Sequence, residues 1–589
     1  VETRQIEPRL DFPYGAAALL TVPGGAPLGL ALSDNENGLV LAAATSDGLL
    51  RVNFADKSEN FLSGEVTLEP EIREVRVDFV VSGLAVSGNH RWLYVGDTQG
   101  RIHRYGLPDL EALQIVQVSD SAISSIAMLL GGISLLTGDH SGAVYQHFPV
   151  RAADNSYSLA FVREFEGLGS PVVDIVPEER RKGFLAIGAG HELGLYHSTA
   201  GRLVKKTSLA ELEPRALALA PRANGLLVEG MGGRLGWLEI NNHHPEISFS
   251  SLWRKVWYEN YQQPEYVWQS SAATNEFEPK FSLTPLVFGT IKAALYAMLF
   301  AIPLALMGAA YTAYFMSPEL RKWVKPGIEI MAALPTVILG FLAGLWFAPW
   351  VEEHLMDLLM MLLLIPPGLL LFAWSWHRFF EQRESLIPEG WEPLLLVPPI
   401  VLLVLVASWL GGPLQLLLFD GDLRSWLSNE AGISYDQRNA LVVGCAMGFA
   451  VIPTIFSIAE DAVFGVPKSL SDGSLALGAT PWQTLLFVVL PTASPGIFSA
   501  LMIGLGRAVG ETMIVLMATG NTPVMDWNLF EGMRTLAANI AVEMPESEVN
   551  SSHYRILFLA ALVLFLFTFV VNTGAELIRQ RLREKYSSL

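Results

Sequence analysis

Hydrophobic and polar residues follow two different patterns along this chain, and the first pattern gives way to the second near residue 283. Residues 1–243 hold short alternating apolar runs separated by Gly, Asp, Asn and Ser, a pattern typical of β-strands joined by turns. From Leu283 onward, apolar runs approach or exceed the roughly 20 residues that a helix needs to cross hydrocarbon. The pattern predicts a multidomain chain, with an all-β domain followed by an all-α polytopic transmembrane domain over 283–589.

One strand-rich unit recurs in the first half. Gly83–Ser87 leads through Trp92–Asp97 to Gly100, and equivalent glycines stand at Gly48 and Gly142, 52 residues before and 42 residues after Gly100. Fainter copies begin at Val173 and Ala216. This period suits four-stranded blades and resembles a WD40-like β-propeller of five or six blades over 1–243, although the Trp-Asp signature is absent. Such a domain is either a docking surface or a spacer without a ligand, and both interpretations stay open.

The membrane half contains seven predicted spans, preceded by an aromatic-rich connector over 244–282 that suits a membrane interface or a packed strap. Proline pairs at 366–367 and 398–399 interrupt the third and fourth spans without excluding them. The spans fall near 283–316, 326–349, 355–376, 392–411, 438–459, 494–518 and 553–578.

Basic residues predict the orientation of these spans. An odd number of spans places the β domain and the C-terminal tail on opposite sides, and Lys and Arg gather in loops that share the tail's side. We therefore expect a multi-pass protein of the bacterial inner membrane with a large periplasmic domain, and, since the chain begins at Val1, a further span before it. The residues on the tail's side are Arg321, Lys322, Lys325, Arg378, Arg383, Lys468, Arg579, Arg581, Arg583 and Lys585.

Composition narrows the possible functions. Hydrophobic residues make up 51% of the chain and charged residues only 16%, with a mean hydropathy of +0.37, so part of the chain needs lipid. A net charge of −19 argues against nucleic acid as a partner. The single cysteine, Cys445, permits no intrachain disulfide, and the histidines show no metal-ligand spacing, so no metal site is predicted. The dipeptide Gly-Lys of a nucleotide-binding P-loop is absent, so ATP hydrolysis would belong to a partner.

An arginine deep in the sixth predicted span is the principal candidate for function. Arg507 lies 13 residues beyond Ser494, roughly 20 Å along a helix, and burying it unpaired costs at least ~2.5 kcal/mol. Glu511, four residues on, is expected to pair with it on the same helix face, next to Gly510 and Thr512. Because a guanidinium gives two parallel hydrogen bonds to an oxyanion, Arg507 is expected to be a transient anion site, the alternative being a permanent structural ion pair.

The loop over 460–491 is a second candidate. It begins with Glu460, and Gly478-Ala479 is followed by Leu490-Pro491 at the spacing that resembles the coupling loop of ABC importer permeases. The resemblance departs from that family where a Glu-Ala-Ala triplet is expected, because Asp472, Gly473 and Ser474 stand there. A glycine turn between two short helices suits a rigid lever that seats in a partner, whereas a plain amphipathic loop is the alternative.

Two motifs narrow the resemblance to one kind of permease. Gly-Arg-Ala-Val-Gly-Glu-Thr at 506–512, and a second motif with Glu329, Pro335 and Gly340, resemble the phosphate-specific (Pst) transporter permeases of the PstC type over about 270–589. The resemblance implies that Arg507 and Glu511 take part in transport, whereas Glu329 near Lys325 is as readily structural. The propeller and the extra spans over 355–411 depart from the short form of that family.

The resemblance also implies partners. The expected assembly joins this chain to a second permease of the PstA type, a cytoplasmic ATPase dimer of the PstB type that binds ATP and Mg, and a periplasmic phosphate-binding protein of the PstS type. The chain itself would be a transport subunit, not an enzyme, moving inorganic phosphate inward by alternating access without a cofactor of its own. Two alternatives are a permease for molybdate, sulfate or a phosphonate, and a membrane anchor or phosphate-status sensor that does not transport.

Overall fold

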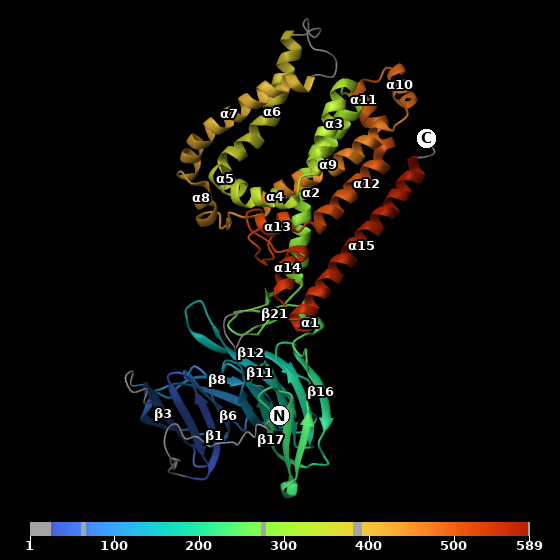
Figure 1. Ribbon diagram of the computed structural model, residues 1–589. Coiled ribbons are helices and arrows are strands. Elements are labelled where there is room, and N and C mark those ends of the chain that lie inside the picture. The colour runs from blue at the N-terminus through green and yellow to red at the C-terminus, as the bar shows by residue number, and fades with distance from the viewer. Residues whose placement is uncertain (1–24, 60–65, 272–277, 381–391, 587–589) are drawn as a thin grey trace, which may run out of the picture. The chain divides into compact units, whose positions relative to one another are not determined.

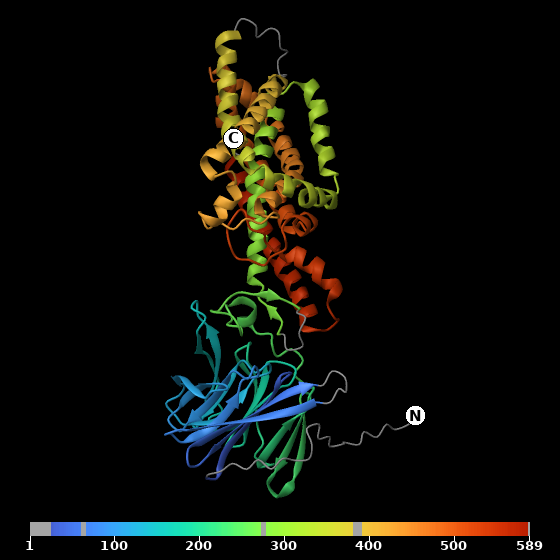
Figure 2. The same cartoon turned by 90° about the vertical axis from the view of Figure 1, so that its left-hand side faces the viewer.

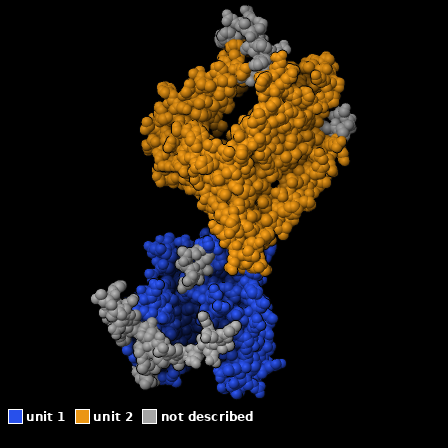
Figure 3. All heavy atoms as spheres, viewed as in Figure 1, with its two compact units in different colours: residues 1–282 blue, residues 283–589 orange. Residues whose placement is uncertain are grey.

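The computed structural model describes residues 25–59, 66–271, 278–380 and 392–586, and it divides into two compact units, 1–282 and 283–589 (Figure 1; Figure 3). The expectations that concern Val1 and Arg383 lie outside the described residues. Unit 1 is built of β-sheets and unit 2 of helices, as the change of hydrophobic pattern near residue 283 predicts.

Unit 1 consists of successive antiparallel sheets in which consecutive strands pair with one another (Figure 2). Four sheets have four strands each and the next has three. Their bounds are β1 Pro27–Asp34, β2 Gly38–Thr45, β3 Leu49–Glu59 and β4 Val66–Arg76; β5 Val81–Val86, β6 Trp92–Asp97, β7 Arg101–Gly106 and β8 Glu111–Gln117; β9 Ile123–Met128, β10 Leu135–Asp139, β11 Val144–Arg151 and β12 Tyr157–Phe165; β13 Val172–Pro177, β14 Gly183–Gly188, β15 Glu192–His197 and β16 Arg202–Ser208; β17 Pro214–Leu219, β18 Gly225–Gly230 and β19 Leu235–Glu239. A 3-10 turn, η1 (Met231–Gly233), joins the last two.

The recurring glycine of the sequence marks the same turn in three sheets. Gly48, Gly100 and Gly142 follow the second strand of their sheets with φ of 79°, 79° and 91°, a conformation that a Cβ disfavours. In two of these turns an aspartate holds the backbone: Asp97 Oδ1 accepts from the N–H of residues 99 and 101, and Asp139 Oδ1 from those of 141 and 143. The repeat therefore corresponds to one structural unit per sheet.

The first strands of neighbouring sheets pack against one another, β1 on β5, β5 on β9 and β9 on β13. Backbone contacts join the sheets as well, since the Gly88 N–H donates to Gly132 O at 2.9 Å. Apolar side chains fill the space between successive sheets, as in the cluster around Val40, Leu84 and Leu93. The described part of unit 1 has five blade-like sheets, which fits the predicted range of five or six. These described strands form no closed barrel, so the complete propeller ring stays a prediction.

The aromatic connector belongs to unit 1. It contains α1 (Phe249–Trp253) and a small two-stranded sheet of β20 (Trp268–Gln269) and β21 (Lys280–Phe281). Tyr258 and Trp268 are buried, and Trp268 packs edge-on against Phe281 with ring centroids 5.6 Å apart. Packing within the unit thus explains these aromatic residues, and a place at a membrane interface stays a prediction.

Within its described residues, unit 2 contains seven helical segments that are long and apolar enough to cross a membrane: Thr284–Tyr314, Thr336–Glu353, Leu355–Arg378, Leu394–Asn429, Ala440–Phe464, Pro481–Gly510 and Ser552–Glu584. The individual elements are α2 Thr284–Tyr314, α3 Pro318–Ala332, α4 Thr336–Leu342, η2 Ala343–Phe347, α5 Ala348–Glu353, α6 Leu355–Phe380, α7 Glu392–Phe419, α8 Leu423–Asn429, α9 Ala440–Phe464, α10 Lys468–Ala476, α11 Pro481–Thr484, η4 Leu485–Val489, α12 Leu490–Gly510, α13 Met513–Ala518, α14 Leu536–Glu543, η5 Met544–Glu546 and α15 Ser552–Tyr586.

The centre of unit 2 is the close packing of α2, α9 and α12 (Figure 1). Small residues make it possible: a Cβ at Gly448 of α9 would lie 3.1 Å from Ala297 O of α2, and one at Gly504 of α12 would lie 2.5 Å from Ile455 Cγ1 of α9. The α6–α7 hairpin packs chiefly on itself and stands apart from this centre in the ribbon view.

Three predicted spans have clearly different ends from those expected. The fourth was expected to end at residue 411, but its apolar helical segment runs over Leu394–Asn429. The second was expected from residue 326, but α3 is a separate amphipathic helix and the chain turns at Pro335, so the span runs over Thr336–Glu353. The sixth was expected over 494–518, whereas α12 begins at Leu490 and ends at Gly510, and α13 is a distinct short helix. In the second and sixth spans the apolar pattern continues across a break in the helical backbone, so hydropathy alone does not reveal the break.

Candidate functional site

Arg507 lies in the last turn of α12 and hydrogen-bonds to a neighbouring helix. Its Nη1 donates to Thr454 Oγ1 of α9 at 2.7 Å, and the side chain is partly buried. The close approach of α12 and α9 at Gly504, one turn earlier, brings the two residues within reach. A guanidinium has five N–H donors, so this bond positions Arg507 and leaves donors for a further acceptor.

Glu511 does not pair with Arg507, and this prediction was wrong. α12 ends at Gly510, and Glu511 has an extended backbone (φ −67°, ψ 129°), so the four-residue spacing no longer places the two side chains on one helix face. Instead Glu511 Oε1 accepts from the backbone N–H groups of residues 512, 513 and 514 at 3.2, 3.1 and 3.4 Å. The carboxylate thus caps the start of α13.

The residues around Glu511 form a tight turn between α12 and α13. Gly510 is exposed at the end of α12, and Thr512 Oγ1 donates to Gly510 O at 3.3 Å. This turn, one helical turn beyond Arg507, is a capped break between two helices. It contains the three residues that the sequence indicated as one motif, Gly510, Glu511 and Thr512.

The second sequence motif packs against this break. Pro335 immediately precedes α4, and a Cβ at Gly340 would lie 2.8 Å from Met513 O at the start of α13. Gly344, four residues later, is even closer to the α13 backbone, since a Cβ there would lie 2.3 Å from Met517 O. These two glycines allow α4 and η2 to lie against α13, so the structure brings Gly340 to the Glu511 turn.

Glu329 takes no part in that contact. It lies exposed on α3, where its Oε1 accepts a long 3.5 Å hydrogen bond from Ser457 Oγ, and Lys325 pairs elsewhere. The structural interpretation of Glu329 fits this position better than a role at Arg507.

Glu460 is the buried member of an ion cluster that joins α3 to α9. It was expected at the start of the coupling loop, but it lies within α9 with its side chain 0% exposed. Arg321 pairs with Glu460 Oε1, and Lys325 Nζ lies 2.8 Å from Oε2 and 2.6 Å from Asp461 Oδ1. Sequence reasoning missed this pairing, although Arg321 and Lys325 are spaced one helical turn apart and an apolar run ending in Glu460 needs a cation.

The predicted coupling loop has the expected helix, glycine turn and second helix. α10 ends before Gly478, whose φ of +89° suits only glycine, and its N–H donates to Leu475 O at 2.9 Å. Ala479 leads into α11, which Thr480 caps, and a 2.9 Å hydrogen bond between the Ser474 and Thr484 hydroxyls ties the two helices together.

The outer surface of this loop is open. Asp472 and Gly478 are exposed, and Leu477 at the tip is 91% exposed. By contrast, the start of the following span is anchored, because Leu485 and Val489 are buried with Ala493 and Val463, and Leu490-Pro491 begin α12. A rigid, exposed, partly apolar lever joined to α12 can transmit a displacement to the helix that carries Arg507.

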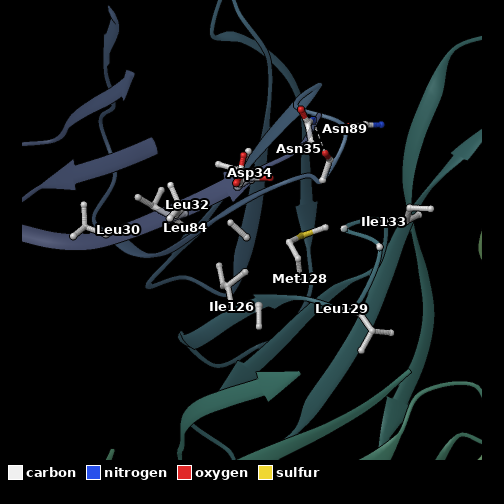
Figure 4. A pocket seen from close by; sticks show the side chains of 18 of the residues that line it. Leu30, Leu32, Asp34, Asn35, Leu84, Asn89, Ile126, Met128, Leu129 and Ile133 are labelled. Carbon is white, nitrogen blue, oxygen red and sulfur yellow. Dashed lines mark hydrogen bonds between the residues drawn. The ribbon is translucent and has the colours of Figure 1, made fainter. Parts of the chain in front are cut away.

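Unit 1 has a cavity of its own, of about 890 Å³ (Figure 4). The first strands of three sheets line it with apolar side chains, including Leu32 of β1, Leu84 of β5 and Met128 of β9, while Asp34 and Asn89 lie at its polar edge. Within the described residues no group of three His, Cys, Asp or Glu could hold a metal ion. The cavity suits a docking surface, and the choice between docking domain and spacer stays open.

Comparison with known proteins assigns the helical unit to a class. A model of the family described as "binding-protein-dependent transport system inner membrane component" matches residues 393–584. The chain is 27% identical over 293 residues to the probable ABC transporter permease protein YqgH of Bacillus subtilis, covering 50% of this chain and 70% of that protein. It is 28% identical over 316 residues to the phosphate transport system permease protein PstC of Xylella fastidiosa (54% and 79%), and 27% over 340 residues to PstC of Pasteurella multocida (58% and 82%).

These matches confirm the predicted resemblance to Pst permeases and the class of the membrane domain. The relatives are named as permeases, in line with the expectation of a transport subunit. A chain of a crystal structure of the mitotic checkpoint complex aligns with a TM-score of 0.28 and 15% identity over 36% of this chain and 61% of that chain, too weak a likeness to carry any argument.

Proposed function

We propose that this chain, whose residues 393–584 belong to the family of binding-protein-dependent transport system inner membrane components, is the permease subunit of an ATP-driven importer of inorganic phosphate. The observation that carries the proposal is the state of Arg507, whose guanidinium lies in a membrane-spanning helix. The neutral hydroxyl of Thr454 positions this guanidinium, and no carboxylate of the described residues pairs with it. A cation kept in that state at membrane depth is costly unless an anion uses it.

The chemistry of Arg507 fits a tetrahedral oxyanion. Thr454 takes one N–H of the guanidinium, and the remaining donors can give two parallel hydrogen bonds to phosphate oxygens. Glu511, one turn away, caps the start of α13 and so does not compete for Arg507. Phosphate is favoured among oxyanions because two of the relatives reported above are named as phosphate transport permeases.

The energy for transport comes from partners in this proposal. A cytoplasmic ATPase dimer of the PstB type, which binds ATP and Mg, engages the tip around Leu477 and moves it, and the anchored start of α12 carries the movement to Arg507. A second permease of the PstA type and a periplasmic binding protein of the PstS type complete the assembly. Alternating access then exposes Arg507 first to the periplasm and next to the cytoplasm. The basic C-terminal tail lies in the cytoplasm, so the β unit is periplasmic in the bacterial inner membrane.

Uptake by the reconstituted complex tests the role of Arg507. The full chain is co-purified with its partners, placed in liposomes, and assayed for ATP-dependent uptake of labelled phosphate. Arg507→Gln is expected to lower uptake at least about tenfold, which is 1.4 kcal/mol of lost anion interaction. The matched control is Leu299→Ala, an exposed apolar position on α2 away from Arg507, which should leave uptake unchanged. Normal uptake by an assembled Arg507→Gln complex contradicts the proposal.

Two further measurements separate the alternatives. Competition of labelled phosphate by sulfate, molybdate and a phosphonate identifies the preferred oxyanion, and preference for another anion would replace phosphate in the proposal. Deletion of residues 472–480 should abolish stimulation of the ATPase while the chain still inserts and binds the second permease. Retained stimulation would exclude the coupling role of the loop.

A further inference from the structure

A groove of about 570 Å³ runs between α12 and α15 in the helical unit. Five residues of α12 and five of α15 line it, and its polar members spread along the whole length. They are Ser499 on α12, and Thr568, Asn572, Glu576 and Arg579 on α15. The rest of the lining is apolar, but uncompensated polar side chains within two membrane-spanning segments are unusual on a lipid-facing surface.

Asn572 is the residue that lipid would not satisfy. The hydroxyls of Ser499 and Thr568 donate to backbone carbonyls of their own helices, at 3.1 and 2.9 Å, which is how such residues are accommodated in hydrocarbon. The exposed carboxamide of Asn572 makes no hydrogen bond to the part of the chain that the structure describes. Without a partner, an amide in hydrocarbon costs several kcal/mol, so this face of α15 needs water, protein or a polar ligand.

The groove reaches the level of Arg507. Asn572 Oδ1 lies 3.6 Å from where a Cβ at Gly506 would stand, and Gly506 directly precedes Arg507. The missing side chain at Gly506 keeps the groove open there. Arg507 is not one of the lining residues, but the preceding Gly506 is, so the Asn572 amide lies beside α12 one residue away from Arg507 along the chain.

The other end of the groove carries a paired arginine. Arg579 lies seven residues beyond Asn572, about 10 Å along α15. Its Nε and Nη2 donate to the two carboxylate oxygens of Glu576 at 2.8 and 2.7 Å, and both side chains are exposed. This two-bond geometry is the one with which a guanidinium also binds phosphate, so an arriving oxyanion can replace Glu576 without a change of shape.

From this arrangement we infer that the α12–α15 groove is the part of the anion path between Arg507 and the membrane face that bears Arg579. Asn572 is a positioning residue that hydrogen-bonds the phosphate after Arg507 releases it, and Arg579 receives it at the cytoplasmic end. The inference rests on the proposed function and adds a route and two residues to it. The proposed occupant of the groove is a hydrated tetrahedral oxyanion. If a lipid chain or a helix of the second permease is found to fill the groove, this proposal is wrong.

Cysteine accessibility in the assembled complex tests whether the groove is a water-filled path. The only native cysteine is first removed as Cys445→Ala. Asn572→Cys is then compared with Val570→Cys, a position 67% exposed at nearly the same depth but about 200° around α15. The probe is a membrane-impermeant sulfonate-bearing thiol reagent, applied to inside-out vesicles.

Asn572→Cys is expected to react at least about tenfold faster than Val570→Cys, because only the groove face meets water. Inorganic phosphate at saturating concentration should slow that reaction. Equal, slow rates for the two cysteines would mean that lipid or a partner helix fills the groove, and would overturn the inference. A fast reaction that phosphate leaves unchanged would overturn the role of the groove as an anion path.

The role of Asn572 itself needs a kinetic readout. Asn572→Leu, of similar size, should lower the maximal uptake rate about tenfold with little change in half-saturating phosphate, since first capture occurs at Arg507. Asn572→Gln, which keeps the amide, should restore much of that rate, whereas a purely packing role predicts that Leu is tolerated better than Gln. If Arg507→Gln stops uptake while Asn572→Leu does not, this inference fails and the proposed function stands. If the unmodified complex takes up no phosphate, the proposed function fails, and this inference with it.

Discussion

The cap formed by Glu511 makes a prediction that separates the observed contact from the ion pair that sequence spacing favours. Glu511→Ala removes the acceptor of three backbone N–H groups at the start of α13, whereas Glu511→Gln keeps a neutral oxygen in the same place. If the carboxylate acts as a cap, Ala should be damaging and Gln mild. If it acts as the partner of Arg507, Ala and Gln should be about equally damaging, because both remove the charge.

The size of the effect follows from the three contacts. A hydrogen bond to a charged group contributes about 1.5–3 kcal/mol and the loss of a cap costs about 0.5–2 kcal/mol. Since the three N–H groups share one oxygen and one bond is 3.4 Å long, we expect a total near 2 kcal/mol for Ala and below about 1 kcal/mol for Gln. A loss of 2 kcal/mol corresponds to about a 30-fold change in the population of the intact turn.

Hydrogen exchange measured by mass spectrometry reports the turn directly. The peptide that covers 511–518 should exchange about 30-fold faster in Glu511→Ala than in the unmodified complex, and uptake should fall with it. Glu548→Ala, an exposed acidic position outside any helix, is the matched control and should change neither. A double-mutant cycle of Arg507→Ala with Glu511→Ala should give a coupling below about 0.5 kcal/mol. Equal damage from Gln and Ala, together with a coupling above about 1 kcal/mol, would refute the capping account.

Four further predictions concern other contacts. Thr454→Val, which removes the hydroxyl that positions Arg507, should lower phosphate uptake about tenfold, as initial rates would show, and unchanged rates would contradict a positioning role. Glu460→Gln should destabilise the complex in detergent by about 2 kcal/mol, less than for a fully buried pair because both cations reach water, with thermal melting as the measurement. Gly344→Ala should lower the melting temperature by separating η2 from α13, whereas Gly412→Ala, where a Cβ meets open space, should not. Burial lowers the pKa of His147 from 6.5 to about 4, so the unfolded chain binds more protons than the folded chain below pH 6.5. The free energy of unfolding should therefore fall by up to about 3 kcal/mol as the pH drops from 6.5 to 4. Thermal melts followed by tryptophan fluorescence at pH 7.5 and 5 should show this loss of stability, and His147→Phe should make the loss smaller.

Local patterns in the sequence predicted the elements of both units. Alternation of apolar and polar residues is enough for a strand, and the recurring Gly48, Gly100 and Gly142 marked the same turn in successive sheets, because each turn needs a positive φ. A run of about 20 apolar residues is enough for a span, so the number of spans was predicted well. The glycine lever at Gly478 was also predictable, since its conformation depends on neighbouring residues alone.

What the sequence by itself determined is therefore local: which segments are strands or spans, where glycine turns stand, and that Arg507 needs a partner at membrane depth. The tertiary structure alone decided which partner it has. Thr454 is 53 residues away along the chain and reaches Arg507 only because small residues bring α12 and α9 together, while a backbone break at Glu511 turns the expected ion partner into a helix cap. The four-residue spacing of a helix predicts which side chains are neighbours only while the helix continues. Where the helix ends, and which helix packs beside it, depends on contacts between residues that are far apart in the sequence.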